Sequence, residues 1–313
     1  MNNAGSGVDS LQSRHRLALC SCAWLFAAFG IFAPFGAFAQ SGIKLIIDGT
    51  DQAEETVNST VASRAARAAK FPADPLESVM WTNMAERFFS DGKVIFDSRV
   101  SVITPQYAED QFYVPVTVDA TALEADGYKV EQIIALADLN PIPHILTVEP
   151  HKASAFVGFR AKLQQSSPIR VGVKTRDGNW HVNGAWVDAA GGGCTAPAAA
   201  HGNPNWMRTL GKTRAVARRE SDLLTRLSLR MRHPMDTGLA HGIPVFYMSD
   251  IKVKLEDGTP LADVQLFEPV SENPTLTLKP EMAAAESTMA VFARDTEGNE
   301  FRFNLAVPAE VSN

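Results

Sequence analysis

The sequence predicts an all-β protein made of two immunoglobulin-like β-sandwich domains in tandem, with helical segments before the first. Three observations predict this fold class. Short runs of alternating apolar and polar residues recur along the chain, Asp-Gly pairs supply turns between some of them, and no long helical pattern lies among them. Because 45% of the 313 residues are apolar, the chain can bury two cores.

The N-terminal 39 residues are typical of a secretory signal peptide. Leu17 to Ala39 contain no charge, and Ala37-Phe38-Ala39 is a small-residue cleavage pattern. The apolar run is also long enough to serve as an uncleaved membrane anchor. Cleavage would remove Cys20 and Cys22 and export the remainder to the periplasm. The mature chain would then hold one thiol, in a compartment where paired cysteines normally form disulfides.

Residues 40–73 form an N-terminal segment with little amphipathic pattern. A helix is predicted from about 75 to 90, because Asp74 and Glu77 resemble a capping box around Pro75 and apolar residues follow at helical spacing. We expect this helix to pack one face on the strands that follow it.

The first sandwich begins where the apolar period changes to two. Residues 94–102 alternate, residues 114–118 form a compact apolar strand, and residues 169–187 form a hairpin with its turn at Asp177-Gly178. On that hairpin, His181 alternates with Trp180 and Val182. The alternation places His181 on the solvated face.

The second sandwich repeats the same pattern. Apolar and polar residues alternate over 224–234, residues 251–255 precede a turn at Asp257-Gly258, and residues 289–307 form a closing hairpin. Between the sandwiches, residues 191–205 are rich in glycine, alanine and proline and resemble a flexible linker.

Cys194 lies in this linker, directly after Gly191, Gly192 and Gly193. Ordering glycine costs more conformational entropy than ordering any other residue, so this is a poor place to hold a catalytic thiolate against a base. It suits a thiol that moves, and an extended arm from Asp188 would carry the sulfur roughly 15 to 20 Å. A flexible linker with an incidental cysteine is the alternative.

Three motifs carry a resemblance to a known family. GGGCTAP (191–197) after a hairpin, with ALADLNPIP (135–143) upstream, resembles the SoxY subunit of the bacterial sulfur-oxidation carrier. HPMDTG (233–238) is similar to a segment of its partner subunit, SoxZ. A single exported chain that contains both kinds of motif resembles the fused SoxYZ-like carrier proteins associated with quinoprotein dehydrogenases. The domains would then be a SoxY-like sandwich at 74–190, the cysteine-bearing linker at 191–205 and a SoxZ-like sandwich at 206–313.

The resemblance implies a carrier and not an enzyme. The arm cysteine of the family holds a sulfur intermediate covalently while separate periplasmic redox enzymes act on it, and only Cys194 can take that role here. Thr195 and Ala196 replace the two glycines that follow the family's cysteine, and the arm is tethered at both ends. No cofactor is expected beyond a covalent sulfur adduct on Cys194, and no stable membrane association after signal cleavage.

The thiol lacks an evident activator. An ordinary cysteine has a pKa near 8.5, and Lys174, Arg176 and His201 are the nearest candidates in sequence to lower it. No phosphate-binding loop and no paired carboxylates at a usable spacing are present, which argues against an enzyme in its own right. The net charge of −6 argues against nucleic-acid binding.

The HPMDTG segment has three interpretations. His233, Pro234, Met235, Asp236, Thr237 and Gly238 favour a strand that ends in a tight turn, since proline precludes a helix there and glycine tolerates positive φ. The segment could instead form an interface between the sandwiches. Met231, His233 and Met235 would share one strand face and could bind copper.

Two other function classes stay open. A thiol-dependent metal chaperone would use Cys194 with His201, and a two-sandwich binding module would use surfaces and not the thiol. A basic run near the start of the second sandwich is either a solvated face or a docking site for an acidic partner such as a cytochrome. Its members are Arg208, Lys212, Arg214, Arg218 and Arg219.

Overall fold

A computed structural model describes residues 63, 66, 70–309 and 311. The predicted signal peptide and most of the N-terminal segment lie outside these residues. The first half contains α2 (Trp81–Phe88), β1 (Val94–Phe96), β2 (Ser101–Ile103), β3 (Val114–Asp119), α3 (Thr121–Ala125), β4 (Val130–Ala137), β5 (His144–Glu149), β6 (Ala153–Ala161), β7 (Ser167–Thr175) and β8 (Trp180–Val187). The second contains η1 (Ala199–Gly202), η2 (Trp206–Thr209), β9 (Thr213–Arg219), β10 (Thr225–Met231), β11 (Asp236–Thr237), β12 (Val245–Phe246), β13 (Met248–Leu255), β14 (Pro260–Leu266), β15 (Thr275–Pro280), β16 (Thr288–Asp295) and β17 (Glu300–Ala306).

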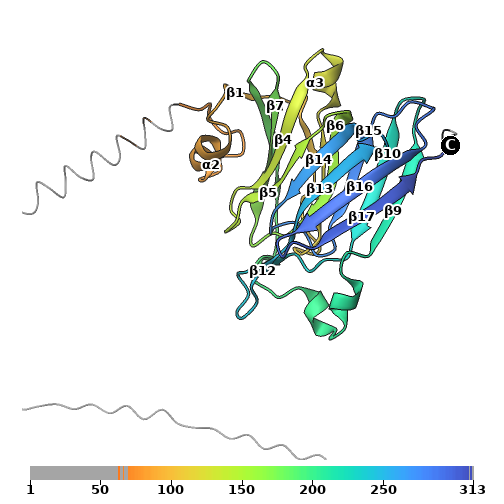
Figure 1. Ribbon diagram of the computed structural model, residues 1–313. Helices are drawn as coiled ribbons and strands as arrows, with labels where there is room; N and C mark the ends of the chain where they lie inside the picture. The colour runs from red at the N-terminus through yellow and green to blue at the C-terminus, as the bar shows by residue number, and fades with distance from the viewer. Residues whose placement is uncertain (1–62, 64–65, 67–69, 310, 312–313) are drawn as a thin grey trace, which may run out of the picture. The chain divides into compact units, whose positions relative to one another are not determined.

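The strands form two main sheets, and the all-β, immunoglobulin-like class predicted from the sequence is confirmed (Figure 1). One sheet has the order β1-β8-β7-β4-β5-β14-β13-β16-β17, and the other β2-β3-β6-β15-β10-β9. Both sheets run through both halves, because β5 pairs with β14 and β6 with β15, antiparallel in each case. Strand pairing therefore joins the two predicted sandwiches within each sheet.

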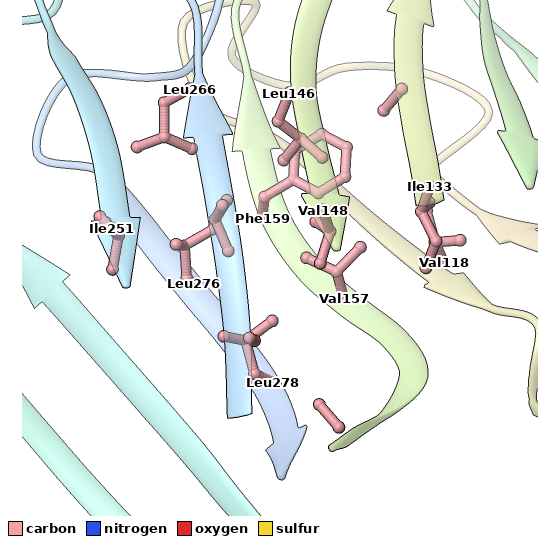
Figure 2. Close-up of a cluster of buried hydrophobic side chains, with 14 of the residues drawn as sticks. Val118, Ile133, Leu146, Val148, Val157, Phe159, Ile251, Leu266, Leu276 and Leu278 are labelled. Carbon is pink, nitrogen blue, oxygen red and sulfur yellow. The ribbon is translucent and has the colours of Figure 1, made fainter. Parts of the chain in front are cut away.

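The main core lies between the sheets and is also shared. Alternating residues of β3 and β10 are buried, as a sheet with one solvated face requires. One apolar cluster includes Val148 and Phe159 of the first half and Ile251 and Leu276 of the second, all drawn in Figure 2. Removal of this apolar surface from water is the main driving force for folding.

The hairpins follow the sequence prediction. β7 and β8 pair around Gly178, which has φ +83°, and β13 and β14 pair around Gly258, which has φ +88°. Glycine reaches this left-handed region without steric cost, so Asp-Gly is a dependable turn signal. β16 and β17 form the closing hairpin.

The predicted helix at 75–90 is shorter than expected. α2 begins at Trp81, and Asp74 accepts hydrogen bonds from the backbone of Leu76 and Ser78 in a turn before it. Glu77 has φ +51°, which ends any helix there. The capping pattern correctly predicted that Asp74 accepts backbone hydrogen bonds. Those bonds close a turn, and the helix itself begins only at Trp81.

A buried charge cluster fixes this N-terminal turn to the sheet. The guanidinium of Arg170 on β7 is fully buried and donates to both carboxylate oxygens of Asp138 and of Asp74, at 2.7 to 3.2 Å. Its carbon lies 4.4 Å from the centroid of the Trp81 ring. Burial raises the pKa of Asp138, while Arg170 opposes that rise.

His181 is buried, which corrects the prediction of a solvated residue. Its Nδ1 lies 2.7 Å from Oδ2 of Asp97, and its ring packs edge-on against Tyr128. The sheet face on which His181 lies, opposite the face of Trp180, is therefore also shielded from solvent at this position.

No helix within the described residues has both the length and the apolar character to cross a membrane.

Candidate functional site

The cysteine segment, residues 191–205, is packed onto the body of the protein at the end that carries β11 and β12 (Figure 1). The backbone N–H of Gly192 donates to the carbonyl of Gln164 at 3.0 Å, and that of Gly193 to the carbonyl of Leu163 at 3.0 Å. The amide of Cys194 donates to Oε1 of Gln164 at 3.1 Å. The prediction of an extended arm is therefore wrong for this conformation, because these hydrogen bonds hold the backbone beside residues 162–164.

The glycines allow this close approach. Gly191 and Gly192 have φ of +98° and +89°, and a Cβ on Gly193 would lie 2.5 Å from the Leu163 carbonyl oxygen and 2.7 Å from that of Gln111. A side chain at Gly193 would force the backbones apart. Gly191 and Gly193 thus have a packing role in this conformation, and Gly192 supplies a left-handed backbone turn, whereas the sequence predicted mobility alone.

The thiol is buried, with 1% of Cys194 exposed. Its Sγ is 3.8 Å from the carbonyl oxygen of Lys162, a weak contact for a thiol donor. Burial raises the pKa of Cys194 to about 11, and the positive charge of Lys162 opposes that rise. The ordinary pKa and the solvent-accessible sulfur predicted from the sequence are both corrected by this burial.

The predicted activators do not act on the thiol. Lys174 pairs with Asp91, and Arg176 with Glu131. The cation that acts on Cys194 is Lys162, which is itself buried and whose Nζ donates to the carbonyl of Met235. Burial lowers the pKa of Lys162 to about 8, against the raising effects of Cys194 and Asp236.

The ALADLNPIP motif supplies the support under the cysteine. The side-chain amide of Asn140 donates to the carbonyl of Lys162 at 2.8 Å, and its oxygen accepts from the amide of Gln164 at 2.8 Å. Asn140 therefore fixes both ends of the short stretch against which Gly193 and Cys194 pack. This role of Asn140 was not predicted from the sequence, although the residue lies within a motif that carries the resemblance.

The HPMDTG segment covers the cysteine segment from the second half of the chain. Thr237 Oγ1 donates to the carbonyl of Cys194 at 2.5 Å, and Oδ2 of Asp236 lies 2.9 Å from Nε2 of His201. Met235 and Gly238 have φ of +55° and +74°, and the two residues between them pair with β12. The structure thus combines a short strand with a contact between the two halves.

The structure gives the three residues of the copper hypothesis other contacts: Met231 and Met235 belong to the apolar core, and the sulfur of Met235 accepts a hydrogen bond from the amide of Met248 at 3.3 Å. Met231, His233 and Met235 are all buried, and Nδ1 of His233 accepts a hydrogen bond from the backbone of Met235 at 3.2 Å. Across residues 70–309, no three or more His, Cys, Asp or Glu side chains gather as a metal site. His201 pairs with Asp236, and no contact joins it to Cys194 in this part of the chain.

A cavity of about 200 Å³ adjoins the cysteine segment. Gly193 and Ala196, which flank Cys194, line one side, and Lys162 lines another. Pro234, Met235 and Asp236 of the HPMDTG segment close it. The site can therefore hold a thiol in protonated, solvent-shielded form next to a small space.

Two family models match this chain. The model of sulfur oxidation protein SoxY matches residues 85–194, and that of sulphur oxidation protein SoxZ matches residues 213–305. The SoxY match ends at Cys194. The chain therefore carries a SoxY region followed by a SoxZ region, a fused SoxYZ-like arrangement, and the cysteine segment joins them.

Three solved structures that resemble this chain have low sequence identity to it. The sulfur carrier protein SoxY from Chlorobium limicola f thiosulfatophilum is 19% identical, over 41% of this chain and 97% of that protein, with a TM-score of 0.29. A glycosyl hydrolase family 2 member from Bacteroides cellulosilyticus DSM 14838 is 13% identical over 63% and 24%, with a TM-score of 0.17. The adhesin InvE of Yersinia pseudotuberculosis is 12% identical over 67% and 59%, with a TM-score of 0.18. A search of curated protein sequences finds no match.

Proposed function

We propose that this chain is a periplasmic sulfur carrier, in which Cys194 covalently holds a sulfur-containing intermediate while separate redox enzymes act on it. The observation that carries the proposal is the SoxY region that ends at Cys194 and is followed by a SoxZ region. Cys194 is also the only cysteine in the part of the chain that the structure describes. Cys20 and Cys22 lie outside it.

The chemistry needs an oxidant that the carrier itself does not supply. When the Cys194 sulfur bonds to the sulfur of a reduced inorganic compound, the S–H bond of the thiol breaks, its proton and any proton on the second sulfur are released, and the two sulfurs together lose two electrons. A redox enzyme must accept those electrons, and a later enzyme must break the new bond. The carrier contributes the sulfur atom and its delivery, which agrees with a non-catalytic role.

The buried thiol represents a closed form of the carrier. With a pKa of about 11, about one thiol in ten thousand is ionised at pH 7 in this form. The thiolate is the nucleophile, so the closed form is protected from oxidation and cannot load cargo. Loading requires release of the cysteine segment from residues 162–164 and from Thr237, which exposes the sulfur.

The location and the enzyme system are part of the proposal. The secretory pattern of residues 1–39 supports export, and the fused arrangement resembles carriers associated with quinoprotein dehydrogenases. Redox enzymes of that class, or cytochromes, would be the clients.

The test is the intact mass of the protein purified from its own cells, with and without reductant. We expect a fraction with added mass on the peptide that contains Cys194, removed by reductant when the cargo is held through a disulfide. Cys194→Ser should abolish both the adduct and the sulfur-dependent activity of the cells. An unmodified Cys194 under sulfur-oxidising conditions, with full activity of Cys194→Ser, would contradict the proposal.

A binding module that does not use the thiol is the second candidate. The burial of Cys194, 1% exposed, favours it, because small buried cysteines often serve packing alone. Cys194→Ala tests it together with Cys194→Ser, since a packing role is sensitive to volume and polarity but not to thiol chemistry. Normal cellular function of both variants would support the binding module.

A further inference from the structure

The outer face of β9 and β10 is strongly basic, although the chain as a whole has a net charge of −6. Arg214 and Arg218 project from β9, Arg230 projects from β10, and Lys212 and Arg232 flank them; all five are exposed. Arg219, predicted to belong to this run, is buried and donates to the carbonyls of Pro308 and Met282, so it is a structural residue.

The cations of this face have few acidic neighbours. Arg214 and Arg230 are directly opposite each other in the antiparallel register, and like charges so placed destabilise a sheet. None of the five is in an ion pair within residues 70–309, whereas Arg226 on β10 pairs with Glu220. Among the described residues, no ion pair therefore offsets the repulsion between these five cations.

The basic face is continuous with the surroundings of the cysteine segment. Lys212, Arg214, Arg230 and Arg232, with Thr209 and Thr213, line a groove of about 670 Å³ that has no acidic residue in its walls. Thr209 and Arg232 also line a neighbouring hollow whose other walls include Ala199 and Ala200 of the cysteine segment. A molecule seated on the basic face would lie beside that segment.

We propose that this face, made of Lys212, Arg214, Arg218, Arg230 and Arg232, is the docking surface for an acidic partner protein. The cations extend over about 20 Å along β9, which exceeds the size of a small oxyanion and suits a protein surface. The acidic remainder of the chain would repel such a partner elsewhere, so the charges would orient it as well as attract it. Identification of the partner as a client redox enzyme rests on the proposed function, but docking itself does not require the thiol of Cys194.

The experiment uses a photo-cross-linking amino acid at Val216, which is exposed between Arg214 and Arg218. The full-length protein is expressed in its own host, and the cross-linked partner is identified and purified. Its affinity for the carrier is then measured at 50 and 200 mM NaCl. Arg214→Glu/Arg230→Glu is compared with Arg176→Glu/Lys252→Glu, which changes the net charge equally but on the nine-stranded sheet and its β7–β8 turn. The same probe at Val79, also exposed, controls for general capture.

We expect a net acidic protein cross-linked from Val216 and not from Val79, with affinity that falls at the higher salt. Arg214→Glu/Arg230→Glu should weaken binding at least tenfold, and the control pair less than twofold. Cys194→Ser should dock normally, so failure of the carrier role would leave this result intact. Capture of only a second copy of this chain or of nucleic acid, no capture, or equal binding by the charge-reversed variant would overturn the proposal.

Discussion

Two buried polar sites of this molecule differ in how completely their groups are paired. The Arg170 guanidinium donates to four carboxylate oxygens of Asp74 and Asp138 and stacks on Trp81. The Cys194 thiol has one weak contact with a carbonyl, and the neighbouring Lys162 ammonium donates to one carbonyl and has no carboxylate partner in an ion pair within the described range. A buried group with many partners loses them all when its site opens, whereas a sparsely paired group loses few. Opening of the cysteine site therefore costs little at the thiol and the ammonium, and its main cost is the loss of the hydrogen bonds that hold residues 192–194.

The largest expected loss of stability comes from replacement of Arg170, whose buried guanidinium is fully paired. Arg170→Met leaves the buried Asp138 carboxylate without its counter-charge and should lower the free energy of unfolding by about 3 to 5 kcal/mol. Urea denaturation measures this change. Arg302→Met, which removes an exposed pair with Glu300, should cost less than about 1 kcal/mol. Equal losses in the two variants would mean that the buried cluster does not anchor the N-terminal turn.

The pH dependence of thiol reactivity should show the closed form directly. The closed form favours the protonated thiol, so the contribution of the thiol to the stability of the closed form is constant below about pH 9 and falls as the pH approaches 11. Alkylation of Cys194 by iodoacetamide should therefore rise up to about pH 11 in the native protein. In urea it should level off about two pH units lower.

A control removes the second group that titrates in this range. The lowered pKa of Lys162, about 8, favours the closed form as Lys162 loses its proton above that pH. Lys162→Met abolishes this contribution and should leave the high alkylation pKa of Cys194 in place. A native alkylation profile that matches the one in urea would show that the thiol is not buried in solution.

Gly193→Ala should open the cysteine site without touching the thiol. The added Cβ would lie 2.5 Å from the Leu163 carbonyl oxygen, so the segment must move away from residues 162–164. We expect alkylation of Cys194 at pH 7.5 to accelerate at least tenfold. Gly202→Ala, where an added Cβ meets nothing within 4 Å and φ is not positive, should leave the rate unchanged. An unchanged rate in Gly193→Ala would place the glycines outside the closing contact.

Thr237→Val should give the smallest effect of the series. It removes the hydrogen bond from Oγ1 to the Cys194 carbonyl, together with a local one that Oγ1 accepts from the amide of Leu239, and keeps the side-chain volume. Loss of the bond to Cys194 costs about 1 kcal/mol of closing free energy. This corresponds to about fivefold faster alkylation. Thr237→Ser retains the hydroxyl and should behave like the wild type. If Thr237→Val and Thr237→Ser react equally, the HPMDTG segment does not hold the cysteine segment closed.

Local patterns predicted the strands well but not the cysteine site, for a physical reason. Alternation and Asp-Gly turns act within one hairpin, so β7, β8, β13 and β14 could be predicted from neighbouring residues. Gly193 was misinterpreted because glycine serves both chain freedom and close backbone approach, and only the partner, Leu163, distinguishes them. His181 was misplaced because Asp97, 84 residues away, makes its burial possible. Asn140 and Thr237 act through contacts with residues 22 and 43 positions away in the sequence, which no periodicity reveals.

The strand pairs β5–β14 and β6–β15 limit how the carrier can open. Separation of the SoxY and SoxZ regions would break the backbone hydrogen bonds of two strand pairs and divide one apolar core. Such a separation is equivalent to unfolding. Exposure of the sulfur must therefore be a unimolecular loop motion. The rate at which Cys194 becomes accessible should then be independent of protein concentration, unlike the rate in a protein whose site opens by dissociation of subunits.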